Sequence, residues 1–266
     1  MEQKKLRMTV KVGTSSLTHS NGEPNLRNLD KLAQTLSDLK SMGYEIILVS
    51  SGAIAVGVHK LRLVRRPEEL RLKQAAASVG QCELMHLYDK FFGEYNVSVG
   101  QILLTREDVE RPEVKENLLR TFDSLMELGA IPIVNENDSV SHEEIESEQK
   151  IFGDNDTLSA IVAALCGADL LVLLSDIDGL YEADPRIQPE ARLISEVRII
   201  DDNLRKLASG AGSARGTGGM ITKLDAASIC MERGIDMIIA NGAHPEQLYG
   251  IEDGVPFGTL FVGNRD

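Results

Sequence analysis

The chain has 266 residues, of which 42% are hydrophobic and 26% are charged, and its formal net charge is −13. This size and composition suit one globular domain with a sizeable core, and we expect residues 1–266 to form that domain. The acidic balance disfavours nucleic acid as a partner, because proteins that bind it usually present a basic face. The sequence shows no apolar run of membrane-spanning length and no secretory signal, which predicts a cytoplasmic protein without membrane attachment.

Strand and helix patterns alternate along the chain. Apolar runs typical of buried strands occupy residues 6–10, 44–50, 97–104, 130–134, 170–174 and 236–240. Helical patterns lie between them, at residues 27–42, 68–92, 113–128, 157–167 and 220–233. This alternation predicts an α/β fold, a three-layer α-β-α sandwich in which helices cover both faces of a largely parallel central sheet.

Two helical patterns carry further information. The first is followed by Gly43, placed like the glycine that commonly ends a helix. The longest, residues 68–94, has the small residues Ala75-Ala76-Ala77-Ser78-Val79-Gly80 at its centre, which allow another helix to approach closely. Such a helix either crosses over within its own domain or contributes to a subunit interface, and both alternatives remain open.

Three cysteines, Cys82, Cys166 and Cys230, lie far apart in the sequence. They form no C-x-x-C pair or Cys/His cluster, so the sequence does not identify a metal site, and their odd number fits a reducing compartment. We interpret each of them as a small core residue.

Ligands of open α/β sheets bind at the carboxyl ends of the strands, so the residues that follow each apolar run are the candidates for function. The first run leads into Lys11-Val12-Gly13-Thr14-Ser15, where a lysine and backbone N–H groups can hold a phosphate. The alternative is a solvent-exposed lysine. The second run leads into Ser50-Ser51-Gly52, which opens a helix and is either an anion-binding helix start or a simple N-cap.

Acidic and amide side chains follow the later strands. Asn135-Glu136-Asn137-Asp138-Ser139 is either a turn or a site for an α-ammonium group. Gly153-Asp154-Asn155-Asp156-Thr157 opens a helix with more polar residues than one cap requires, and a carboxylate there can orient nearby lysines. Ser175 and Asp176 stand where an adenine nucleotide can lie across a strand end, whereas Asp178-Gly179 is equally well explained as a turn.

The segment Gly216-Thr217-Gly218-Gly219-Met220-Ile221-Thr222-Lys223 has the features of a phosphate cradle. Glycine lets backbone N–H groups approach an anion, a helix predicted to begin at Met220 adds unpaired N–H donors, and Lys223 lies on its first turn. The pattern differs from G-x-x-x-x-G-K-[ST], and a flexible loop before an ordinary helix is the alternative. Two lysines, glycine-backed N–H groups and acids without a nucleophile–base triad favour direct phosphoryl transfer.

In these segments the chain resembles the amino acid kinase family, and within it the members that phosphorylate glutamate. The resemblance extends from about Thr9 to about Phe261. It rests on the order and spacing of Lys11 to Ser15, Val49-Ser50-Ser51-Gly52-Ala53-Ile54, Asn135 to Asp138, Gly153 to Asp156, Ser175-Asp176 with Gly179-Leu180-Tyr181, and Gly216 to Lys223. Members that act on other small acids share the first motif but generally lack this combination.

The resemblance implies that ATP and L-glutamate give ADP and L-glutamate 5-phosphate, the first step of proline synthesis. It implies catalytic roles for Lys11 and Lys223, which neutralise the transferring group, and for Asp156, which orients them. Glutamate is expected at Ser51, Gly52, Asp138, Asp154 and Asn155. ATP is expected at Lys11, Gly13, Ser175, Asp176, Thr217, Gly218, Gly219, Met220, Ile221, Thr222 and Lys223, with Mg²⁺ carried mainly by the nucleotide phosphates.

The resemblance also implies partners. Members of the family are often inhibited by proline, and we expect a homo-oligomer, a dimer or tetramer, with possible hand-off of the product to glutamate-5-phosphate reductase. Many members carry a C-terminal PUA domain, and because this sequence stops at Asp266 we expect a form without it. Two alternatives remain: a kinase of the same fold acting on another small carboxylate, and a non-catalytic sensor of an amino acid or nucleotide.

Overall fold

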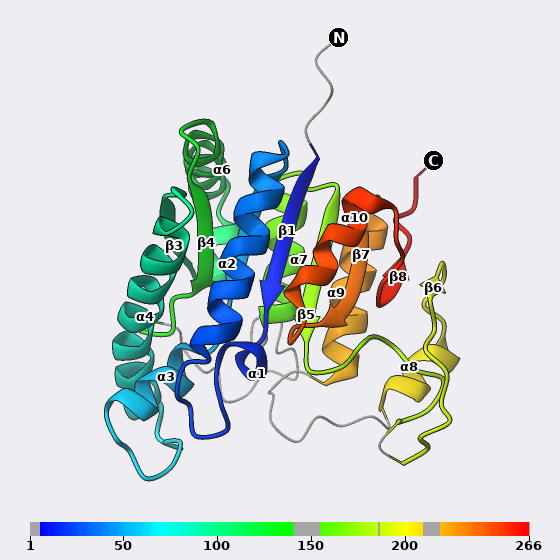
Figure 1. The fold of residues 1–266 in the computed structure, drawn as a ribbon, viewed down its shortest axis with the longest axis horizontal. Coiled ribbons are helices and arrows are strands. Elements are labelled where there is room, and N and C mark those ends of the chain that lie inside the picture. Colours follow the sequence, from blue (N-terminus) through cyan, green and yellow to red (C-terminus); the bar gives the residue numbers. More distant parts are fainter. Residues whose placement is uncertain (1–5, 141–154, 186, 210–218, 266) are drawn as a thin grey trace.

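A computed structural model describes residues 6–140, 155–185, 187–209 and 219–265 (Figure 1). Within these residues, one sheet has the strand order β3-β4-β2-β1-β5-β7-β8-β6. Its strands are β1 (Arg7–Val12), β2 (Glu45–Ser50), β3 (Val99–Leu104), β4 (Ile131–Glu136), β5 (Leu170–Ser175), β6 (Glu196–Val197), β7 (Asp236–Asn241) and β8 (Thr259–Phe261).

The sheet is largely parallel, as the alternation of strands and helices predicts. Parallel pairing runs without interruption from β3 through β4, β2, β1 and β5 to β7. At one edge the direction reverses, because β8 pairs antiparallel with β7 and β6 pairs parallel with β8. The sequence does not predict the two short strands β8 and β6, since two or three residues are too few to show a strand pattern.

Helices cover both faces of the sheet, which confirms the three-layer prediction (Figure 1). One face carries α2 (Leu26–Ser41), α3 (Ala53–Lys60), α4 (Leu70–Gly93) and the 3₁₀ helix η1 (Pro245–Tyr249). The other carries α6 (Pro112–Glu127), α7 (Asn155–Leu165), α8 (Asp202–Ser209) and α9 (Met220–Glu232). Shorter helices are α1 (Thr14–Leu17), α5 (Arg106–Glu110) and α10 (Gly250–Asp253). Among the described helices, none combines the length and apolar character that a membrane span requires.

Alternation along the strands separates the hydrophobic packing on one face of the sheet from that on the other. In β1, Val10 and Val12 pack with α2 and α4, whereas Lys11 belongs to the opposite set of positions. In β5, Val172 belongs to the same packing as Val10 and Leu173 packs with α7 and α9. The face that carries α7 and α9 is therefore the face that Lys11 reaches.

The observed boundaries agree with the predicted ones to within a few residues, and two differences matter for function. Strand β4 continues to Glu136, so Asn135 is part of the sheet and not of a turn. Helix α7 starts at Asn155, two residues before the predicted start. The predicted helix end at Gly43 is confirmed: this glycine has φ +103°, and Gly43 N donates to Lys40 O while Tyr44 N donates to Leu39 O.

Helices α3 and α4 approach each other backbone to backbone. A Cβ atom added at Gly57 would lie 1.8 Å from Ala76 O, and one added at Gly80 would lie 1.8 Å from Ala53 O. The small residues of α4 therefore pack against α3 of the same chain, which is the crossover alternative for this part of the helix. A subunit interface formed by the other surfaces of α4 remains a prediction.

We predict that Gly80→Ala lowers the free energy of unfolding by about 3 kcal/mol, because backbone cannot move aside as a side chain does. Gly93→Ala is the matched control in the same helix, since an added Cβ meets no atom within 4 Å there. That variant should be stabilised by about 0.5 kcal/mol through its higher helix propensity. Urea denaturation of both variants gives the comparison, and equal stabilities would contradict the close packing of α3 on α4.

Candidate active site

The predicted site segments meet at the end of the sheet where the parallel strands have their carboxyl ends. Strands β4, β2, β1 and β5 are neighbours and parallel, so their carboxyl ends lie side by side. Helices α1, α3 and α7 begin near these ends, and the arrowhead of β1 in Figure 1 points to the end of the sheet where α1 and α3 lie. Residues that are far apart in the sequence therefore share one surface.

The centre of the site is an ion triad formed by Lys11, Asp156 and Lys223. Lys11 Nζ lies 2.5 Å from Asp156 Oδ1, and Lys223 Nζ donates to Asp156 Oδ2 at 2.9 Å. The three side chains are 8%, 1% and 7% exposed, respectively. The alternative of a solvent-exposed Lys11 is therefore wrong. The triad itself, with two cations and one anion, carries a net positive charge at the carboxyl ends of the strands.

The electrostatic state of Asp156 follows from its surroundings. Burial acts to raise the pKa of this carboxyl, but the charges and hydrogen bonds of Lys11 and Lys223 outweigh burial and hold the pKa well below its usual range. Asp156 is therefore ionised at neutral pH and fixes the positions of two ammonium groups. In a buried setting this costs desolvation free energy, so the arrangement is better explained by function than by stability.

The start of α9 adds backbone donors beside the triad. Helix α9 begins at Met220 as predicted, with Gly219 as its N-cap, a residue that has no side chain to cap the first turn. Thr222 Oγ1 lies 2.8 Å from Gly219 O and 3.3 Å from Asp156 Oδ2, which ties this turn to the triad. Such a helix start favours an anion. Thr217 and Gly218 lie outside the described residues.

A second polar group of residues, the amide cluster, lies next to the triad and comprises Asn135, Asn155, Ser50 and Ser51. Asn155 Nδ2 donates to Ser50 O at 2.8 Å, to Ser51 Oγ at 2.9 Å and to Asn135 Oδ1 at 3.1 Å. Gly52 follows with φ +92°, a left-handed conformation that glycine adopts without strain, and it is the N-cap residue of α3. Predicted substrate residues from β2 and α7 are thus brought together, while Asp154 lies outside the described residues.

Asp138 lies on the wall of a cavity of about 370 Å³ between α4 and the ends of β3 and β4. The cavity is also lined by Gln81, Cys82 and Ser139. Burial raises the pKa of Asp138 to about 6, although the charge of Arg66 acts in the opposite direction. A cationic ligand group would lower this pKa again, so the carboxyl is suited to bind one.

The predicted nucleotide residues lie at the neighbouring strand ends. Ser175 ends β5, where its hydroxyl donates to Asp176 Oδ1 at 3.2 Å and its carbonyl accepts from Gly242 N at 2.7 Å. Gly13 follows β1 and donates its N–H to Leu174 O at 3.1 Å. Ser175 is buried, whereas Asp176 is exposed to solvent. Asp178, which the sequence left as a turn residue, accepts from Asn241 Nδ2 at 2.7 Å.

Two features of the site did not follow from the sequence. Gln81 accepts a hydrogen bond from Asn135 Nδ2 at 2.8 Å, which links α4 to the amide cluster. A local signal existed, because Gln81 shares the buried helical positions of Ala77, Leu84 and Tyr88, where an apolar residue is usual. Cys82 is exposed on the cavity wall, so its interpretation as a core residue was wrong, whereas Cys166 and Cys230 are buried as expected.

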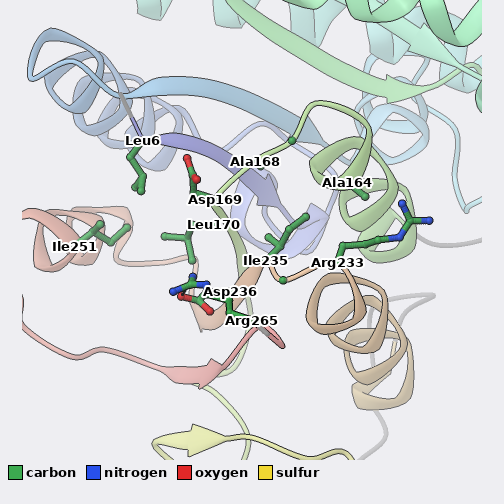
Figure 2. A pocket seen from close by; sticks show the side chains of 12 residues that line it. Leu6, Ala164, Ala168, Asp169, Leu170, Arg233, Ile235, Asp236, Ile251 and Arg265 are labelled. Atoms are coloured by element: carbon green, nitrogen blue, oxygen red, sulfur yellow. Dashed lines mark hydrogen bonds and ion pairs between the residues drawn. The ribbon is translucent and has the colours of Figure 1, made fainter. Parts of the chain in front are cut away.

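A further cavity, of about 750 Å³, lies at the opposite end of the sheet and takes no part in this site. Leu6, Asp169, Leu170, Ile235 and Asp236 line it at the amino ends of β1, β5 and β7. Figure 2 shows Arg265 beside Asp236, with Arg233 pointing away from both. No three His, Cys, Asp or Glu side chains gather into a metal-binding cluster in the described part of the chain.

Comparison with known proteins identifies the family to which this chain is similar. Residues 7–241 match the model of the amino acid kinase family. The glutamate 5-kinase of Clostridium perfringens (strain 13 / Type A) is 54% identical over 97% of this chain and 96% of its own length. That of Listeria monocytogenes serotype 4b (strain CLIP80459) is 54% identical over 98% and 94%. Carbamate kinase from Giardia lamblia bound to AMP-PNP superposes with a TM-score of 0.68 at 13% identity, covering 98% and 99% of the two chains, which shows a shared fold.

We predict that Asp156→Asn lowers the free energy of unfolding by about 3 kcal/mol at neutral pH, because two buried lysines lose their counter-ion. The folded pKa of Asp156 is depressed, so its stabilisation is complete above the unfolded pKa of about 3.9 and is lost as the pH falls further. The difference between the variant and the wild type should therefore be constant down to about pH 5 and shrink below about pH 4.

Urea denaturation across this pH range measures the difference. Glu113→Gln removes the carboxylate of an exposed pair with Arg111 and should leave stability nearly unchanged. A similarly small effect of Asp156→Asn at neutral pH would contradict the charged, buried triad.

Proposed function

The chain belongs to the amino acid kinase family, and we propose that it transfers the γ-phosphoryl group of ATP to the γ-carboxylate of L-glutamate, giving ADP and L-glutamate 5-phosphate. Relatives that are 54% identical over nearly their whole length are glutamate 5-kinases, which supports this substrate. The observation that carries the proposal is the buried Lys11–Asp156–Lys223 triad at the carboxyl edge of the sheet.

The triad answers the main physical difficulty of the reaction. An anionic acceptor must approach an anionic donor, and each pair of charges repels by roughly 4 kcal/mol at 4 Å with an effective dielectric constant near 20. Lys11 and Lys223 are held by one carboxylate, so both ammonium groups face the same small region. Placed against the transferring phosphoryl group, they neutralise this repulsion without reorganisation.

The chemistry then needs no covalent enzyme intermediate. A γ-carboxylate oxygen of glutamate forms the new O–P bond while the bond between the γ-phosphorus and the bridging oxygen of ATP breaks, and ADP leaves with that electron pair. The acceptor is already ionised at neutral pH, so no general base is required. Lys11 and Lys223 stabilise the charge on the phosphoryl oxygens, and Asp156 keeps both in position.

We propose that the amide cluster and the adjacent cavity bind glutamate. Asp138 is the acceptor for the α-ammonium group, and Ser51, Gly52 and Asn155 line the remainder, together with Asp154 outside the described residues. The cavity of about 370 Å³ beside Asp138 is large enough for a small amino acid.

The nucleotide is proposed to lie across the ends of β1 and β5 and the start of α9. Gly13, Ser175 and Asp176 are placed to contact it, and Gly219, Met220, Ile221 and Thr222 present the helix start to its phosphates. Thr217 and Gly218 are assigned to the same loop from the sequence. Mg²⁺ would be carried by the nucleotide phosphates, where it neutralises charge during transfer.

Further proposals rest on the resemblance to the family. We propose that residues 1–266 act as one kinase domain, supported by a single continuous sheet over the described residues. A homo-oligomer, feedback inhibition by proline, hand-off to glutamate-5-phosphate reductase and a cytoplasmic location remain proposals. They require measurements on the protein in solution and in the cell.

The function is tested by following ADP release from Mg-ATP with and without L-glutamate, with hydroxylamine present to trap an acyl phosphate. Glutamate-dependent ADP release with hydroxamate formation is the expected result. Turnover with aspartate, acetylglutamate or UMP in place of glutamate would contradict the substrate while retaining the fold. Absence of turnover with every acceptor would contradict the kinase proposal.

We predict that Lys11→Ala or Lys223→Ala lowers kcat by about two to three orders of magnitude, as for the loss of one preorganised charge donor. Lys31→Ala is the control, because Lys31 pairs with Glu246 on the surface and should leave kcat unchanged. Steady-state kinetics at saturating ATP and glutamate measure the effect. An unchanged kcat in either triad variant would remove that lysine from its role.

We predict that the KM for glutamate rises as the pH falls below about 6, the pKa of Asp138 in the free protein. Only the ionised carboxyl pairs with an ammonium group, so the rise should approach tenfold per pH unit, which corresponds to about 1.4 kcal/mol. Asp138→Asn should raise KM at about pH 8 and flatten its dependence on pH. An equal pH dependence of KM in both proteins would assign the titration to another group.

A further inference from the structure

We infer that Gln81 is a positioning residue for the phosphorylation reaction: by accepting from Asn135 Nδ2 it holds Asn135 Oδ1 in place as an acceptor for Asn155 Nδ2. The inference rests on the proposed function, because it takes Asn155 as a residue that contacts the substrate. Three amides from α4, β4 and α7 form the chain of hydrogen bonds Gln81–Asn135–Asn155.

One end of the chain is set by a backbone carbonyl. Asn155 Nδ2 lies 2.8 Å from Ser50 O, and a carbonyl oxygen can only accept. The amide nitrogen of Asn155 must therefore face β2, where Ser50 O, Ser51 Oγ and Asn135 Oδ1 share its two hydrogens. This orientation leaves Asn155 Oδ1 as the acceptor that a substrate N–H group can use.

The middle of the chain is set by a backbone donor. Asn135 Oδ1 accepts from Glu136 N at 2.9 Å and from Asn155 Nδ2 at 3.1 Å. A backbone N–H can only donate, so the oxygen of Asn135 must be on this side and its nitrogen on the other. Asn135 Nδ2 then needs an acceptor, and Gln81 Oε1 supplies it at 2.8 Å. The direction of every bond is thus fixed by two backbone groups.

Burial makes the contribution of Gln81 specific. Asn135 is 2% exposed and Gln81 is 9% exposed, so the hydrogen bond between them is shielded from bulk solvent. A buried donor without an acceptor is unfavourable, and Asn135 would rotate or shift to find one. Its Oδ1 would then move away from Asn155 Nδ2, and Asn155 would lose one of the three contacts that hold its side chain in place.

The packing of α4 explains why Gln81 can have this role. Gly80, its neighbour, lets α4 contact the backbone of α3 at Ala53, and α3 begins directly after Ser51 and Gly52. The distance between Gln81 and the amide cluster is therefore fixed by helix packing and not by a flexible loop. Gln81 also lines the cavity beside Asp138. The chain of hydrogen bonds Gln81–Asn135–Asn155, called the relay below, therefore has one end at the proposed glutamate pocket.

The test is a double-mutant cycle on the full chain with Gln81→Met, Asn135→Ala and the double variant. Gln81→Met keeps approximate size but removes the acceptor, and we expect the KM for glutamate to rise about tenfold with the KM for ATP unchanged. In the Asn135→Ala background, the same substitution should have no further effect on the glutamate KM, because Gln81 acts through Asn135.

Two kinetic results would overturn the inference. A wild-type glutamate KM in Gln81→Met would show that the relay has no effect on the substrate. Multiplicative increases in the double variant would show that Gln81 acts independently of Asn135. Thr35→Val is the control for a purely structural effect, since it removes a buried hydrogen bond to Lys31 O within α2 and should change stability but not KM.

A wild-type protein without glutamate-dependent turnover would contradict the proposed function and not the relay. The relay is therefore also measured without turnover, from the side-chain amide resonances of ¹⁵N-labelled protein, with Asn135 assigned by its loss in Asn135→Ala. In Gln81→Met the resonances of Asn135 and Asn155 should shift, whereas Thr35→Val should leave them in place. Unchanged Asn135 and Asn155 amides in Gln81→Met would overturn the inference.

Discussion

One buried carboxylate, Asp156, holds two lysines from different parts of the chain, and the remaining structure keeps this arrangement in place. Removing three charges from water is unfavourable unless they are paired closely. Lys11 comes from the centre of the sheet, Asp156 from the start of α7 and Lys223 from the start of α9. The triad itself carries a net positive charge, and such a charge favours a phosphoryl group as ligand.

The register of the sheet determines whether the triad can form. Lys11 reaches α7 and α9 because it occupies the position in β1 that alternates with Val10 and Val12. A shift of one residue in the pairing of β1 with β2 and β5 would turn the lysine into the core formed with α2 and α4. The apolar residues of β1 thus stabilise the fold and also orient Lys11, the lysine that we propose to be catalytic.

Much of this was accessible from the sequence because the relevant signals are local. Apolar runs and helical spacing predicted the six main strands and the layers, and the glycines near Met220 predicted the start of α9. Predictions were less accurate where neighbours in space decide the outcome. Asn135 and Glu136 have the residue types of a turn, but parallel pairing with β3 extends β4 through both.

Long-range contacts explain what the sequence did not predict. The small residues of α4 predicted a close approach, but not that α3 of the same chain provides it. Gln81 interrupts an apolar helix face, which signals a buried polar group without identifying its partner. That partner, Asn135, lies 54 positions away, and only the fold brings the two together.

The start of α7 is where the two polar systems of the site join. Asn155 belongs to the amide cluster and Asp156 to the ion triad, although they are consecutive residues. Because one peptide unit connects them, a displacement of the amide cluster also displaces the carboxylate that orients both lysines. We propose that binding of the acceptor and neutralisation of the phosphoryl group share this helix start, which would bring the reacting groups together with little loss of order on binding.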